Sequence, residues 1–198
     1  MKSTYSIVAV LCGAALSFSS TPPRSTSGQG TPPPFLDQST PWADSVFTSL
    51  SLEQRIAQLM MVAVYSDKDA KHEQGIADMV RDHNIGGLIF FKGGPLRQAK
   101  LTNRFQAAAR TPLLIGMDLE WGLAMRLDST IRFPRQMTLG ALKSDTLIEA
   151  MGLEIAREMT RLGVQVSFRP VLDVNNNPAT PVITDRSFGE AREVVARK

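Results

Sequence analysis

Several residue types that build common functional sites are scarce in this sequence. The single cysteine, Cys12, excludes a disulfide framework and a cysteine-based zinc site. The two histidines, His72 and His83, fall in the polar part of one predicted helix. We therefore expect them on the surface rather than in a metal site or a His-dependent catalytic triad. The 22 lysines and arginines balance 19 acidic residues and form no cluster, which argues against nucleic acid as a partner.

The first apolar run, residues 7–18, has twelve residues, too few to cross a bilayer core of about 30 Å. Lys2 before this run and the small residues after it are typical of a secretory signal peptide, which we place at residues 1–20. We therefore expect an exported protein, periplasmic or extracellular. Residues 21–41 contain six of the twelve prolines and are expected to form an extended linker, so that the folded part spans residues 42–198.

From residue 42 onward, apolar runs of strand length alternate with segments of helical periodicity. The runs that we expect as buried parallel strands are residues 59–64, 86–91, 112–118 and 164–174. Helices are expected from a capping box at Ser51 and Gln54, and over residues 70–83, 95–109 and 144–162. This alternation predicts βαβ units and a parallel sheet, an α/β fold. A (β/α)8 TIM barrel needs about 250 residues, so four units are either a small open sheet or the first half of such a barrel.

Glycine-rich cofactor motifs are incomplete in this chain. Gly93 and Gly94 follow a predicted strand, but no third glycine stands at the spacing of a dinucleotide fingerprint, and no Lys-Ser/Thr pair completes a P-loop. A tight turn before Pro95 explains the two glycines, and we expect no cofactor.

Polar and aromatic residues cluster directly after the third predicted strand. Asp118 ends that strand, and Glu120, Trp121 and Arg126 follow in a long connection. In parallel α/β folds, ligands bind at the carboxyl ends of the strands. Carboxylates accept hydrogen bonds from sugar hydroxyls, an indole stacks on the apolar face of a sugar ring, and arginine donates in a fixed fork. The structural alternative is that Asp118 caps the next segment, Glu120 pairs with Arg126, and Trp121 is a core residue.

A second group of polar residues follows the fourth predicted strand. Asp173 is expected to end this strand, and Asp185 and Arg186 come after an irregular, proline-containing loop. The loops that follow two neighbouring strands would then each place an aspartate and an arginine at the carboxyl ends of the strands. The alternative for Arg186 is a local ion pair with Asp185 or Glu190.

Five segments of the folded part carry a recognisable pattern. They are SLEQRIAQLM (51–60), IGGLIFFKGG (85–94), PLLIGMDLEWGLAMR (112–126), FRPVLDVNNNP (168–178) and DRSFGE (185–190). Together they resemble the N-terminal barrel of glycoside hydrolase family 3. The most specific features are the spacing from Asp118 to Arg126 and the combination of PVLDV with DRSFG. The resemblance covers nearly all of the chain after the linker and implies the first half of a TIM barrel.

The resemblance also implies roles for individual residues. In the family, the aspartate that matches Asp118 binds sugar hydroxyls next to the scissile bond, and the arginines that match Arg126 and Arg186 support or belong to that subsite. The DRSFG form is more similar to the β-N-acetylglucosaminidase branch than to the β-glucosidase branch. Trp121-Gly122 stands where many members have two glycines. This departure is similar to a variant joined to a β-lactamase-like domain, so we expect such a domain downstream.

The resemblance implies retaining hydrolysis through a covalent glycosyl intermediate, which needs two catalytic groups on opposite sides of the anomeric carbon. In the family these groups come later in the barrel, so we expect no catalytic residue within this chain and no activity from it alone. The complete protein is expected to release terminal β-linked N-acetylglucosamine, from peptidoglycan fragments or host glycans. The alternatives are a β-glucosidase of the same family and a non-catalytic, exported sugar-binding α/β protein.

Overall fold

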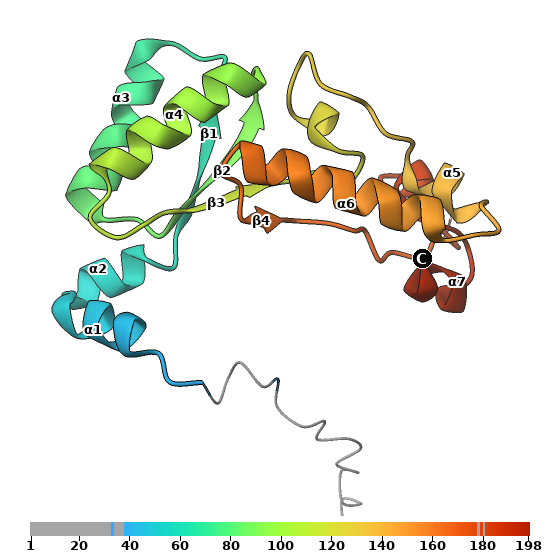
Figure 1. The fold of residues 1–198 in the computed structure, drawn as a ribbon, viewed down its shortest axis with the longest axis horizontal. Coiled ribbons are helices and arrows are strands. Elements are labelled where there is room, and N and C mark those ends of the chain that lie inside the picture. Colours follow the sequence, from blue (N-terminus) through green and yellow to red (C-terminus); the bar gives the residue numbers. More distant parts are fainter. Residues whose placement is uncertain (1–32, 34–37, 178, 180) are drawn as a thin grey trace, which may run out of the picture. The chain divides into compact units, whose positions relative to one another are not determined.

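The computed structural model describes residues 33, 38–177, 179 and 181–198 of the chain. The predicted signal peptide (1–20) and most of the predicted linker lie outside the described residues. Residues 41–198 cluster as one unit, and this unit carries all the helices and strands described below (Figure 1). Within the described part of the chain, no helix has the length and apolar character required to cross a membrane.

A four-stranded parallel sheet with the order β1-β2-β3-β4 forms the centre of this unit. The strands are β1 (Met61–Tyr65), β2 (Gly87–Lys92), β3 (Leu114–Met117) and β4 (Val166–Ser167). Neighbouring strands in the sheet are consecutive in sequence and run parallel. Each strand must therefore reach the next through a crossover connection, as in βαβ units. The predicted α/β fold with a parallel sheet is confirmed.

Helices precede, connect and follow the strands. They are α1 (Pro41–Ser49), α2 (Leu52–Ala57), α3 (Ala70–Asp78), α4 (Pro95–Ala108), α5 (Gln136–Gly140), α6 (Thr146–Arg161) and α7 (Arg192–Arg197), and a π-helical turn, Met79–His83, continues α3. The capping box at the start of α2 is confirmed. The Gln54 backbone N–H donates to Ser51 Oγ at 3.3 Å, and the Ser51 N–H donates to Gln54 Oε1 at 3.1 Å.

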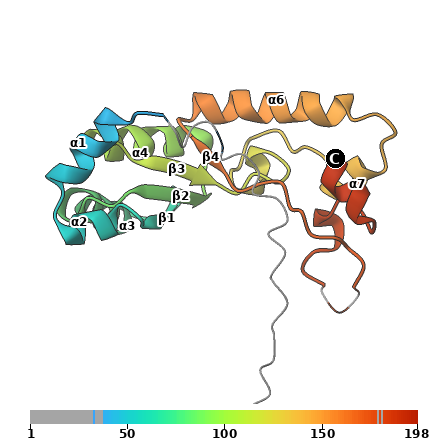
Figure 2. The same cartoon turned by 90° about the horizontal axis from the view of Figure 1, so that it is seen from below.

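The hydrophobic core lies between one face of the sheet and the crossover helices. In β2, Leu88 and Phe90 are fully buried, whereas Ile89 and Phe91 on the other face are only partly buried. Phe105 of α4 is fully buried in the same core. Figures 1 and 2 show α6 running along the segment that follows β4. One face of the sheet is therefore covered by helices, and the opposite face carries partly buried side chains.

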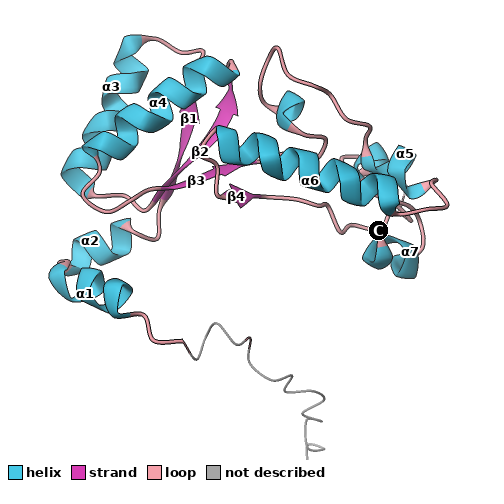
Figure 3. Cartoon of the chain, in the orientation of Figure 1, coloured by secondary structure: helices cyan, strands magenta, loops and turns pink. Residues whose placement is uncertain are grey.

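The fourth strand is much shorter than predicted. Residues 164–174 were expected to be extended and paired, but only Val166 and Ser167 form β4, and the following segment is a loop (Figure 3). Pairing with β3 ends where the Phe168 N–H donates to Met117 O at 3.0 Å, because β3 itself ends at Met117. Pro170, which follows shortly after, has no N–H to donate to a ladder.

The surface prediction for the histidines is right for His83 and wrong for His72. His83 is exposed. His72 is half-buried on α3, and its Nε2 accepts a hydrogen bond from the Tyr65 backbone N–H at 3.2 Å. Its ring also packs edge-on against Tyr65 with 5.8 Å between the ring centroids. His72 therefore joins α3 to the end of β1.

Candidate functional site

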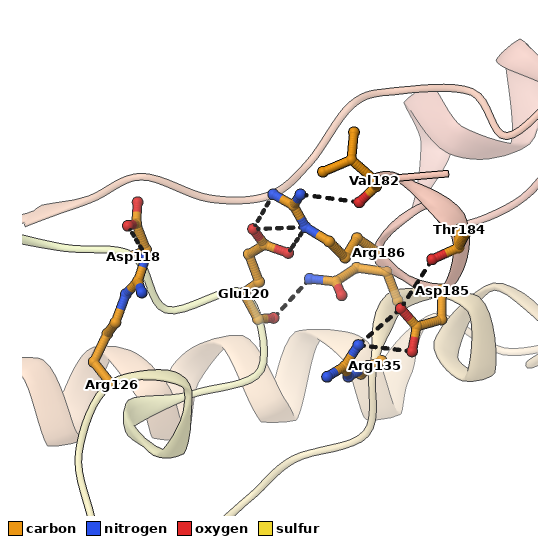
Figure 4. A network of polar contacts seen from close by, with 9 residues as sticks. Asp118, Glu120, Arg126, Arg135, Val182, Thr184, Asp185 and Arg186 are labelled. Atoms are coloured by element: carbon orange, nitrogen blue, oxygen red, sulfur yellow. Dashed lines mark hydrogen bonds and ion pairs between the residues drawn. The ribbon is translucent and has the colours of Figure 1, made fainter. Parts of the chain in front are cut away.

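The candidate site lies at the carboxyl ends of β3 and β4, where two long loops begin. Asp118 follows β3 directly, and the connection from there to α6 contains Glu120, Trp121 and Arg126. Arg186 belongs to the loop after β4. Figure 4 shows that side chains from the two loops point toward one another. The site is therefore built from backbone that the sheet itself places side by side.

Asp118 and Arg126 form an ion pair through Asp118 Oδ2 and Arg126 Nη2. A short 3-10 turn, Leu123–Met125 (η3), brings the two residues together. Gly122 precedes that turn at φ 81°, a left-handed conformation that favours glycine. The side chains of Asp118 and Arg126 remain 24% and 23% exposed, so both can still contact a ligand. The alternative in which Arg126 pairs with Glu120 is wrong.

Glu120 pairs with Arg186 from the other loop. Arg186 Nε donates to Glu120 Oε2 at 2.9 Å, and Nη2 donates to Oε1 at 2.6 Å, a bidentate arrangement. The Glu120 side chain is 4% exposed and that of Arg186 is 30% exposed. A local pair of Arg186 with Asp185 or Glu190 is therefore not what forms. The third and fourth units are joined instead by a nearly buried carboxylate and a guanidinium that still reaches solvent.

The charges of this region act together on Arg186. The hydrogen bond from its guanidinium to Glu120 raises the pKa of Arg186 above its ordinary value. The carboxylates of Asp173 and Asp118 raise the pKa further, because they lie close enough for their charges to act on the guanidinium. Acidic and basic groups of both loops therefore share one electrostatic environment.

Trp121 is buried, as the alternative of a core residue predicts, whereas the position of Asp173 differs from the prediction. Trp121 is only 9% exposed, and the Arg135 guanidinium lies 4.3 Å from the centroid of its ring, so one face of the indole is covered. Asp173 lies in the loop six residues beyond Ser167 and does not end a strand, because β4 is so short. Its side chain is exposed, and its backbone carbonyl accepts a hydrogen bond from Ser187 Oγ at 2.6 Å. The proposed contacts of these two residues with a sugar remain predictions.

Two further elements of the site were missed from the sequence. Arg135, just before α5, contacts Asp185 and Trp121. Tyr65 and Phe91, near the carboxyl ends of β1 and β2, stack with 5.8 Å between centroids, and Arg126 lies 4.7 Å from the centre of the Phe91 ring. Aromatic residues near the ends of two neighbouring parallel strands were the available signal. The first two units therefore also support the site, through Arg126.

The arrangement suits the recognition of a neutral, hydroxyl-rich molecule. Asp118 offers carboxylate oxygens as acceptors, and Arg126 and Arg186 offer partly exposed donors. Because each of these groups already has an opposite charge beside it, the site presents hydrogen-bonding groups with little net charge. Within the described residues, no group of three or more His, Cys, Asp and Glu side chains is arranged to hold a metal ion.

Comparisons with known proteins identify the family to which the chain belongs. The model of the glycosyl hydrolase family 3 N-terminal domain matches residues 51–198. β-Hexosaminidase A of Pseudoalteromonas piscicida is 33% identical over 135 residues, which are 62% of this chain and 23% of that protein. The solved structure of a family 3 β-N-acetylglucosaminidase from Paenibacillus sp. is 33% identical with a TM-score of 0.65, covering 75% of this chain and 29% of that chain.

A third comparison concerns the fold alone. The β-glucoside phosphorylase BglX is 23% identical with a TM-score of 0.73, covering 79% of this chain and 28% of that chain. The chain thus spans less than a third of the length of each of these three proteins. Its four parallel strands and connecting helices correspond to part of a TIM-barrel-like fold. The family model covers most of the chain, and the chain belongs to the glycosyl hydrolase family 3 N-terminal domain family.

Proposed function

We propose that this chain is the sugar-recognition half of the barrel of an exported retaining glycosidase that releases terminal β-linked N-acetylglucosamine. The observation that carries the proposal is the convergence of Asp118, Arg126, Glu120 and Arg186 at one edge of the sheet. Donors and acceptors from two loops can there surround a single ring and bond to neighbouring hydroxyls. Export is part of the proposal, because residues 1–20 have the pattern of a signal peptide.

The choice of sugar rests on the DRSFG segment and on the relatives. Besides the hexosaminidase described above, β-hexosaminidase LpqI of Mycobacterium tuberculosis is 30% identical over 144 residues. A Cellulomonas fimi relative, 25% identical over 160 residues, is named as both a β-N-acetylglucosaminidase and a β-glucosidase. This second name supports β-glucosidase activity as the alternative. Discrimination would depend on whether the site accommodates the 2-acetamido group or the 2-hydroxyl group.

Catalysis is proposed to need groups beyond this chain. A retaining mechanism requires a nucleophile and an acid/base on opposite sides of the anomeric carbon. Asp118 and Glu120 are instead held in ion pairs with arginines. We therefore propose that these residues bind and orient the sugar, and that later units of the barrel supply both catalytic groups. A downstream β-lactamase-like domain is proposed on the departure at Trp121-Gly122 alone.

Kinetics of a full-length version would test the proposal. The wild type is compared with Arg186→Ala on chromogenic β-N-acetylglucosaminide and β-glucoside substrates. Loss of a charged hydrogen-bond donor should weaken substrate binding roughly ten- to a hundred-fold. Arg104→Ala is the matched control, since Arg104 pairs with Glu73 between α4 and α3 at 2.9 Å, away from the loops after β3 and β4.

The possible results separate the candidates. A preference for the glucoside would favour the β-glucosidase alternative. Binding of the free sugar without turnover would favour a non-catalytic sugar-binding protein. Unchanged kinetics in Arg186→Ala would remove Arg186 from the site.

A further inference from the structure

A short helix in the middle of the connection between β3 and α6 reaches both loops of the site. This helix is α5, and Arg135 immediately precedes its first residue, Gln136. The helix packs against the 3-10 turn Thr184–Arg186 (η4), which contains Asp185 and Arg186. A segment that belongs to the third unit therefore lies directly against the loop of the fourth unit.

Arg135 contacts two residues, Asp185 and Trp121, that stand next in sequence to Arg186 and Glu120. Its Nη1 donates to Asp185 Oδ1 and Oδ2, both at 2.8 Å, and Asp185 directly precedes Arg186. The same guanidinium lies 4.3 Å from the centroid of the Trp121 ring, and Trp121 directly follows Glu120. Figure 4 shows Arg135 beside Asp185, close to the Glu120–Arg186 pair. One planar cation thus holds both loops beside the residues that form the pair.

The rest of α5 reinforces this arrangement. Gln136 is 1% exposed, and its Nε2 donates to the backbone carbonyl of Glu120 at 2.7 Å. At the other end of the helix, Gly140 has no side chain, and a Cβ there would overlap the Phe188 carbonyl oxygen. The backbone of the DRSFG segment therefore approaches α5 as closely as a glycine allows.

We propose that Arg135 is a positioning residue that sets the orientation of Arg186 for sugar binding. This inference rests on the proposed function and deepens it, because it identifies what holds the binding arginine in place. Asp185 and Arg186 share one tight turn, so fixing the Asp185 carboxylate also fixes the backbone from which Arg186 extends. Arg135 itself contacts no substrate in this proposal.

If Arg135 only stabilised the fold, its removal would lower the free energy of unfolding; as a positioning residue it should change substrate binding instead. The side chains of Arg135 and Asp185 are 41% and 46% exposed, and ion pairs this accessible contribute little to folding stability. Removing Arg135 should therefore change stability no more than removing Arg104, whose pair with Glu73 is similarly accessible. The effect of a positioning residue should appear in substrate binding, because the sugar requires donors at defined positions.

The test compares Arg135→Ala, Arg135→Lys and Asp185→Asn with Arg104→Ala in a full-length version. For the two Arg135 variants and Asp185→Asn we expect KM for a chromogenic β-N-acetylglucosaminide to rise about five-fold or more, with kcat changed less than about two-fold. Lysine should not rescue, because it lacks the planar guanidinium that lies over the Trp121 ring while its Nη1 bonds to Asp185. Arg104→Ala should leave KM unchanged.

Fluorescence provides a second readout that does not depend on activity. The chain has two tryptophans, and Trp42 is 63% exposed, so Trp42→Phe leaves Trp121 as the reporter within these residues. This experiment uses residues 1–198 joined to the remaining barrel units, with any later tryptophans also replaced. Loss of Arg135 should expose the indole and increase its quenching by acrylamide.

The outcomes are distinguishable from failure of the proposed function. If Arg186→Ala weakens binding while Arg135→Ala and Asp185→Asn leave KM unchanged, the positioning role is overturned and the proposed function stands. If the wild type neither binds nor cleaves the sugar, both proposals fall, and increased quenching in Arg135→Ala would then establish only a structural contact. Full rescue of KM by Arg135→Lys would also overturn the proposal, because a simple positive charge would suffice.

Discussion

Removing Arg186 should leave a charge without its partner inside the protein. Glu120 is 4% exposed and bonds to the Arg186 guanidinium through both carboxylate oxygens, at 2.9 and 2.6 Å. In Arg186→Ala this carboxylate would remain where water reaches it poorly. Breaking a fully buried pair by removing one partner costs about 3–5 kcal/mol. Because the Arg186 side chain is 30% exposed, solvent screening should reduce the loss to about 2–3 kcal/mol.

A second substitution separates the stranded charge from the lost contacts. In Arg186→Ala/Glu120→Gln the buried group is neutral, so the loss should fall to about 1 kcal/mol, the net value of a typical hydrogen bond. The double variant should therefore be more stable than the single variant Arg186→Ala. Glu120→Gln alone should cost about 1 kcal/mol, because the remaining guanidinium can still be hydrated.

Urea unfolding of a full-length version in which Trp42 and any later tryptophans are replaced, followed by the emission of Trp121, would measure these differences. The four proteins form a double-mutant cycle, in which the wild type and the two single variants are compared with the double variant. Equal stability of Arg186→Ala and the double variant would refute the reasoning, because the charge on Glu120 would then carry no cost. A less stable double variant would refute it as well.

The remaining predictions concern backbone space, a partly buried acid and the incomplete sheet. Gly140→Ala should lower stability by roughly 2 kcal/mol in urea unfolding, since its Cβ would overlap the Phe188 carbonyl oxygen, whereas Gly152→Ala in α6 meets open space and should add about 0.5–1 kcal/mol. Burial raises the pKa of Glu158, so the carboxyl favours its neutral form in the folded state, and stability should fall as pH rises from the ordinary pKa through the raised one. Glu158→Gln should therefore gain stability at pH 7 in urea unfolding between pH 4 and 8, and the same change at exposed Glu149 should not. Residues 42–198 alone should aggregate and lack activity, and a monomer in light scattering that cleaves a chromogenic β-N-acetylglucosaminide would contradict this.

The main helices and strands were predictable from local patterns. The capping box at Ser51 and Gln54 forms as expected, because both hydrogen bonds depend on residues three positions apart. The apolar run at 86–91 becomes β2, one residue later than predicted at each end. The run at 164–174 failed as a strand because pairing depends on the neighbouring strand as well as on apolar character. β3 ends at Met117, and the pairing ends with it.

Four of the residues that converge after β3 and β4 could be named from the sequence, but the pairing among them could not. Asp118, Glu120, Arg126 and Arg186 were all recognised from their places after strands. Which carboxylate takes which arginine depends on the 3-10 turn that directs Arg126 back toward Asp118. The turn leaves Glu120 free for Arg186, 66 residues later in the chain. No local pattern contains that information.

Arg135 escaped notice for a related reason. It lies 17 residues after Asp118 in a connection whose course cannot be read from apolar spacing. Its two contacts, with Asp185 and with the ring of Trp121, come from segments that meet only when α5 packs against the loop after β4. A residue that joins two loops becomes visible only when both loops have been placed.

The pairing of the site also bears on what the missing part of the barrel must supply. β1 and β4 each have a single neighbour among the described strands, so the sheet leaves backbone groups unpaired at both edges. The ion pairs of Asp118 and Glu120, in contrast, are complete within these residues. It follows that closing the barrel should chiefly stabilise β4 and cover the partly exposed face of the sheet. The arrangement of the groups proposed to bind the sugar should already be determined by the two loops and by α5. Adding the missing strands should therefore raise stability more than it changes the relative positions of Arg126 and Arg186.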